Sequence, residues 1–278
     1  MAVKCRDGII IQSDTLFSNE DDYSIIEGKL FCILDTKNQN IALLLANRRD
    51  WFEETIELLR KKFSITGENL TQETIRELLA ESRLKQMKDF FDEIKAQGKD
   101  PENEIKERRI SYPFFGIVVV RLTKNENIEY HIYNYDLIER PHSELFLTIG
   151  DGNIEVSLLL GKVVNSFLNR MELKWEDLSA KLVSQILYFV MRYTTQNRIT
   201  VGGKINGYLL NKNGLVSYGL EEFFNKTYED VKKGKEKDYL PEFVQTIIDE
   251  LPPQKTKEFA KIAFSKSKLQ IVKSILGF

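Results

Sequence analysis

The chain begins with two short apolar runs on either side of a turn. Residues 3–5 and 8–12 have the composition of strands, and Arg6-Asp7-Gly8 separates them. Asp-Gly is typical of tight turns, because glycine accepts a positive φ without a steric penalty. The pattern therefore predicts a β-hairpin within the first 12 residues, followed by a polar loop over residues 18–24.

A second pair of strands and two helices are predicted next. The strands cover residues 29–34 and 41–46, with a turn between them. Because every residue from Ile41 to Ala46 is apolar, we expect both faces of that strand to be covered. Apolar residues then recur at helical spacing, which predicts helices around residues 52–63 and 75–94.

Further strands and helices are predicted in the second half of the chain. Residues 95–109 are dense in charge and predict an exposed connector. Three strands, two helices and two short strands are predicted after it, at about residues 114–122, 128–135, 144–149, 158–168, 178–193, 205–210 and 215–218. From Leu220 to Phe278 the pattern is helical only.

The order of these elements indicates the fold class. Four strands, a helix pair, three strands, a helix pair and two strands do not alternate as in a doubly wound fold. The order favours an α+β fold in which two antiparallel sheets pack face to face between helix layers, a four-layer αββα sandwich. We expect a domain of residues 1–219 with a charged insertion near 95–110, and a helical C-terminal extension over residues 220–278.

Composition and charge narrow the class of protein. The 278 residues are 42% hydrophobic and 29% charged, which is typical of a soluble, globular chain with a full core. With 40 basic and 42 acidic side chains, nothing favours a nucleic-acid partner, and the tyrosine-rich residues 129–135 are interpreted as an ordinary strand rather than a base-stacking platform. The apolar runs are too short for a membrane span and no signal peptide is recognised, so we expect a cytoplasmic protein.

Cysteine and histidine are scarce, which limits the candidate chemistry. The chain has two of each, namely Cys5, Cys32, His131 and His142. They do not form a metal-binding cluster at the usual spacings, so no metal and no cofactor are expected. A Cys–His nucleophile pair has no supporting motif, and we expect both cysteines to be small buried thiols on strands.

Five motifs along the chain resemble one known family. They cover residues 2–15, 27–31, 41–49 with the helix from Trp51, 148–153 and 202–206. In this order they look like the first hairpin, the approach to the third strand, the fourth strand with the first helix, the Gly-rich turn and the paired glycine of proteasome subunits. Over about residues 1–219 the chain therefore resembles the proteasome-like N-terminal-nucleophile (Ntn) hydrolases.

The resemblance implies a candidate site at two residues. In the family, the first residue of the mature chain is a Thr, Ser or Cys whose own α-amino group accepts its proton. A lysine near the nucleophile and an aspartate that holds this lysine charged complete the site. The resemblance matches Asp14 to that aspartate and Lys29 to that lysine. Without the resemblance, the two would be an ordinary surface pair.

The family's nucleophile has no counterpart in the sequence. Met1 falls where the first strand is already under way, Ala2 has no nucleophilic atom, and Cys5 lies inside the strand. Three other positions also depart from the active members of the family: Asp151, Arg198 and Val201. We therefore expect the Asp14–Lys29 pair to be retained without the group that it once supported.

Three functions are compatible with these features. The one we expect is a non-catalytic, assembly-forming protein, a homo-oligomer with a proteasome-like fold. The second is an active threonine-type (Ntn) peptidase or amidohydrolase that acts on a peptide or protein, with its true N-terminus upstream of Met1. The third is an unrelated α+β binding module that shares only the pattern. None of them calls for a cofactor, a nucleic acid or a membrane.

Overall fold

The computed structural model describes most of the chain up to residue 218. The described residues are 1–19, 22–25, 28–47, 50–66, 70–107, 114–124, 126–135, 144–150, 153–170, 172–197, 204–218, 246, 249–251, 253 and 255. They belong to two compact units: Gly28–Gly150 with Met1 form the first, and Ala2–Glu27 with Asp151–Phe278 form the second. The predicted boundary after residue 219 stays a prediction.

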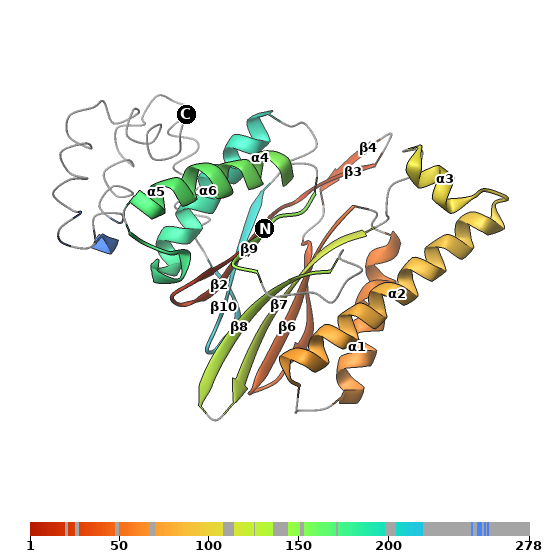
Figure 1. The fold of residues 1–278 in the computed structure, drawn as a ribbon, viewed down its shortest axis with the longest axis horizontal. Coiled ribbons are helices and arrows are strands. Elements are labelled where there is room, and N and C mark those ends of the chain that lie inside the picture. The colour runs from red at the N-terminus through yellow and green to blue at the C-terminus, as the bar shows by residue number, and fades with distance from the viewer. Residues whose placement is uncertain are drawn as a thin grey trace. The chain divides into compact units, whose positions relative to one another are not determined.

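The first unit is built on a four-stranded antiparallel sheet (Figure 1). Its order is β5-β6-β7-β8, with β5 at Leu30–Asp35, β6 at Gln39–Asn47, β7 at Phe114–Lys124 and β8 at Asn127–Asn134. The apolar residues Ile41 to Leu45 of β6 are buried on both faces, as the unbroken apolar run predicted. The strand predicted over residues 144–149 is shorter in the structure, where β9 covers only Phe146–Leu147.

Two long helices lie against this sheet. α1 (Asp50–Thr66) contacts β5 and α2 (Gln72–Ala96), and both helices confirm the helical spacing of the sequence. A buried chain of polar side chains joins them: Tyr135 Oη donates to Gln86 Oε1 at 2.6 Å, and Gln86 Nε2 donates to Thr55 Oγ1 at 2.5 Å. Buried polar groups need such partners, so this series of hydrogen bonds holds α1, α2 and the end of β8 together.

The charged connector after α2 contains a short helix that was not predicted. α3 covers Pro101–Lys106. Asp100 caps it, since its carboxylate accepts a hydrogen bond from the N–H of Glu102 at 3.1 Å, and proline occupies the first turn, where no N–H is needed. The many charged residues of this stretch favoured a loop in the sequence prediction, although Asp100-Pro101 is typical of a helix start.

The second unit contains an antiparallel sheet that joins the first strands of the chain to strands from residues 205–217. Its strands run in the order β11-β10-β2-β1, with β1 at Ala2–Cys5, β2 at Gly8–Asp14, β10 at Ile205–Asn211 and β11 at Gly214–Ser217. α6 (Ala180–Asn197) packs on β1, β2 and β10 (Figure 1). The side chain of Gln12 links sheet and helix by donating to the backbone oxygen of Ser184 at 2.9 Å.

Two details of the second unit correct the sequence prediction. The stretch predicted as a polar loop over residues 18–24 forms a hairpin of β3 (Leu16–Asn19) and β4 (Asp22–Ile25). The helix predicted over 158–168 is a succession of α4 (Asn153–Leu158), a π-helical stretch η1 (Leu159–Val164) and α5 (Asn165–Arg170), followed by the 3₁₀ turn η2 (Trp175–Asp177). The two antiparallel sheets with their helices confirm the α+β class, while the four-layer stacking stays a prediction.

Candidate functional site

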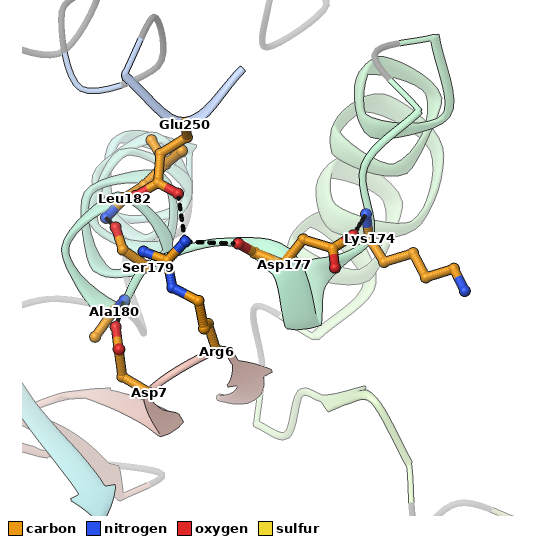
Figure 2. Close-up of polar contacts among 8 residues, drawn as sticks. All are labelled: Arg6, Asp7, Lys174, Asp177, Ser179, Ala180, Leu182 and Glu250. Atoms are coloured by element: carbon orange, nitrogen blue, oxygen red, sulfur yellow. Dashed lines mark hydrogen bonds and ion pairs between the residues drawn. The ribbon is translucent and has the colours of Figure 1, made fainter. Parts of the chain in front are cut away.

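The turn between β1 and β2 is fastened to the start of α6. Arg6 donates its backbone N–H to the carbonyl of Leu178 at 2.9 Å. The carboxylate of Asp7 accepts a hydrogen bond from the backbone N–H of Ala180 at 2.6 Å (Figure 2). A carboxylate is favourable at a helix N-terminus, where N–H groups lack partners within the helix. The turn therefore sets the position of the hairpin that carries Asp14.

Asp14, the predicted acid, is the last residue of β2 and is buried. It lies opposite Ile205 of β10 in the sheet register. The next residue continues the pairing: the N–H of Thr15 donates to the carbonyl of Lys204 at 3.0 Å, and the Oγ1 of Thr15 accepts from the N–H of Lys204 at 2.9 Å. Backbone pairing on both sides of the strand end thus holds Asp14 in a fixed place.

Lys29, the residue that the resemblance matches to the lysine of the family's site, stands directly before β5 and is half-buried. Its carbonyl accepts a hydrogen bond from the N–H of Leu45 on β6 at 2.9 Å, which extends the β5–β6 pairing by one step. Lys29 belongs to the first unit and Asp14 to the second. Their predicted meeting in one site stays a prediction.

Three side chains near the start of the chain have a thiol or hydroxyl that could act as a nucleophile, and all three are buried. Cys5, Ser13 and Thr15 are each less than a tenth exposed. Burial in the sheet raises the pKa of the Cys5 thiol to about 11, so the thiol stays protonated at neutral pH and is a poor nucleophile. The hydroxyl oxygen of Thr15 already accepts the backbone hydrogen bond from Lys204. Buried in this way, none of these three side chains is in a position to attack a substrate.

The remaining cysteine and the described histidine show no shared site. Cys32 on β5 is exposed, so the expectation that both thiols are buried is wrong for Cys32 and confirmed for Cys5. His131 on β8 is buried, stacks on Tyr133 and places its Nε2 at 3.2 Å from Glu129 Oε2. Hydrogen bonds from Gln72 and then from His131 lower the pKa of the Glu129 carboxyl. This cluster ties β8 to the start of α2.

Several predicted positions lie outside the described residues. They are His142, Asp151, Arg198, Val201 and the paired glycines Gly202 and Gly203. Gly150, which opens the Gly-rich turn, is described and has a φ of +92°, a backbone conformation that favours glycine.

Neither a metal cluster nor a membrane-spanning helix is found among the described residues. Within these ranges, the side chains of His, Cys, Asp and Glu form no group of three or more suited to hold a metal ion. Over the same ranges, no helix has both the length and the apolar character needed to cross a membrane.

Sequence reasoning missed the groups that anchor the hairpin. The Asp-Gly signal located the turn, but its partners at residues 177–180 lie more than 170 positions away. No local pattern reports such a contact. Most sequences contain many aspartates and several helix starts, so the sequence alone does not predict that Asp7 accepts a hydrogen bond from the first residue of α6.

Comparison with known proteins supports the fold. The sequence matches no family model and no curated protein. Among solved structures, the chain is similar to Anbu (ancestral beta-subunit) from Yersinia bercovieri, with 11% sequence identity and a TM-score of 0.52, over 85% of this chain and 95% of that one. At this identity the likeness shows the fold alone, which is proteasome-like.

Proposed function

We propose that this protein is a non-catalytic member of the proteasome-like proteins that acts by assembling with copies of itself. In this proposal the two sheets pack face to face between helix layers, and the protein works in the cytoplasm. Asp14 and Lys29 form an ion pair at the base of a former cleft, which now serves as structure. Such a pair is retained because removing one partner would leave an uncompensated charge.

The burial of Cys5, Ser13 and Thr15 is the observation that carries the non-catalytic half of this proposal. An attacking group must reach its substrate and lose its proton. The Cys5 thiol does neither, with its pKa raised by burial to about 11. The Thr15 hydroxyl accepts a backbone hydrogen bond, and its position after β2 is fixed by the pairing with Lys204. The proteasome-like fold supplies the scaffold without, by itself, supplying chemistry.

Exposed apolar side chains on the helices support the assembly half. On α4, Ile154 is 68% exposed and Leu158 is 46% exposed, and the two are one helical turn apart on the same face. In the first unit, Ile65 of α1 and Leu84 of α2 are also exposed. Ile154 and Leu158 together form an apolar face on α4, which we propose as a subunit contact, whereas single exposed apolar residues are common on protein surfaces.

Replacing Leu158 with glutamate tests the assembly directly. If α4 forms a subunit contact, a carboxylate buried there without a partner should weaken association by about 100-fold. Light scattering at micromolar concentration should then show an oligomer for the original protein and smaller species for L158E. Val216, an exposed apolar residue on β11, gives the matched control, and V216E should assemble normally. A strict monomer before any substitution would overturn the proposal.

The second candidate is an active Ntn peptidase or amidohydrolase whose N-terminus lies upstream of Met1. The presence of both Asp14 and Lys29 favours it, because these are the supporting residues that the resemblance assigns to an active site. In this case an N-terminal Thr, Ser or Cys would attack the substrate carbonyl and expel the protonated amine to form an acyl-enzyme, and water would then hydrolyse the acyl-enzyme to free the residue and release the acid. Sequencing the N-terminus of the native protein distinguishes the two, since only the active form begins with such a residue.

A further inference from the structure

The side chain of Glu250 brings the far end of the described chain to the β1–β2 turn. Its Oε2 lies 3.3 Å from Nη1 of Arg6, across 244 positions of sequence (Figure 2). The Glu250 side chain is only 11% exposed, whereas that of Arg6 is 57% exposed. A carboxylate that leaves water is costly unless a cation and hydrogen bonds receive it, so Arg6 is the group that makes this placement possible.

Arg6 is itself held in position by the start of α6. The same Nη1 donates to the carbonyl of Asp177 at 3.3 Å, and the backbone N–H of Arg6 donates to Leu178. Figure 2 shows the guanidinium between the Asp177 carbonyl and the Glu250 carboxylate. Arg6 therefore points toward Glu250 as part of a fixed turn rather than as a freely rotating surface side chain.

A second ion pair with the opposite polarity lies five residues further along. Lys255 Nζ is 3.0 Å from Oε1 of Glu172, which stands in the connection between α5 and η2 with a φ of +59°. Between the two pairs, Leu251 is buried, and Thr246 ahead of them is buried as well. Glu250 thus meets a basic partner and Lys255 meets an acidic one, on either side of the buried Leu251.

We propose that Glu250, Leu251 and Lys255 form an intramolecular clasp that fastens this part of the chain to the β1–β2 turn and to the α5–η2 connection. Leu251 contributes the apolar burial that favours attachment. The two ion pairs contribute direction, because reversing the segment would bring Lys255 to Arg6 and Glu250 to Glu172, and like charges would face each other. Each pair has one largely exposed partner, and neither pair belongs to the hydrogen-bond ladder of the sheet, so we expect the clasp to open without unfolding the sheet.

Hydrogen exchange of the full-length protein, followed by mass spectrometry, tests the clasp. In R6E two carboxylates face each other, so the amides of residues 246–255 should exchange about tenfold faster, while those of β2 and β10 keep their rates. The charge-swapped double variant R6E/E250R should return exchange toward the original rate. K162E makes the same charge change at an exposed residue of η1 and should leave the segment unaffected.

Two outcomes would overturn the proposal. One is unchanged exchange of residues 246–255 in R6E, or a double variant no slower than the single one. The other comes from mixing R6E with E250R: a contact within one chain is not repaired by mixing, whereas a contact between copies is restored in mixed oligomers. Recovery of slow exchange on mixing would show that the segment docks on a neighbouring copy. Neither result depends on whether the protein hydrolyses peptides.

Discussion

Replacing Gly8 with alanine is expected to lower the free energy of unfolding by about 4 kcal/mol. Gly8 has a φ of +143°, which L side chains rarely adopt, and it begins β2 directly after the turn. A Cβ at this position would lie 2.1 Å from the carbonyl oxygen of Leu210 on β10. Because the contact is with backbone, the clash can be relieved only by moving one strand of the sheet. Urea denaturation monitored by circular dichroism gives the measurement.

Gly28 offers the matched control for this substitution. Its alanine variant would place a Cβ with no heavy atom within 4 Å, so G28A should change stability by less than about 0.5 kcal/mol. If G8A proved as stable as G28A, the register of β2 against β10 would be wrong, and with it the placement of Asp14.

Removing the guanidinium of Arg121 is the second change with a large expected effect. Arg121 is buried on β7, where its Nε donates to Asn40 Oδ1 at 2.5 Å and its Nη2 donates to the carbonyl of Lys37 at 2.9 Å. Asn40 in turn donates to the carboxylate of Asp35. Arg121 thus donates hydrogen bonds from β7 to the β5–β6 turn. R121L should cost about 3 kcal/mol, because it leaves the buried amide oxygen of Asn40 and the carbonyl of Lys37 without this donor.

Two further variants separate geometry from charge at this position. R121K keeps the charge but loses the planar fork, so it should recover only part of the stability lost in R121L. K85M removes an exposed cation of α2 in the same unit and should have almost no effect. Thermal unfolding of the four proteins under one buffer condition is sufficient. An R121L protein as stable as K85M would contradict the role given to Arg121.

The parts of the fold that were predictable are those whose burial is written in local spacing. The apolar run from Ile41 to Ala46 and the helical spacing of α1 and α2 each report one face or two faces of a single element. The β3–β4 hairpin escaped prediction because its polar residues are those of a loop. The π-helical turn at Leu159–Val164 escaped because one extra residue per turn leaves almost no trace in an apolar pattern.

The polar groups that join segments far apart in the sequence were not predictable. Arg121 stands in a strand beside an apolar run, and an arginine there is ordinarily expected to point to solvent. Its acceptors on the β5–β6 turn come from residues more than 80 positions earlier. Arg6 meets Glu250, and Asp7 meets the N–H of Ala180, in the same way, across long stretches of the chain. Such contacts depend on the tertiary fold, so they become visible only when the strands and helices are in place.

We propose that a proteasome-like fold is used here for assembly and not for peptide hydrolysis. Native mass spectrometry of the protein with its own N-terminus, after incubation with an acylating β-lactone, tests both halves at once. We expect an oligomer whose subunits carry no acyl group at Cys5 or at the N-terminal residue. A monomer, or subunits that each carry one acyl group on an N-terminal Thr, Ser or Cys, would contradict the claim.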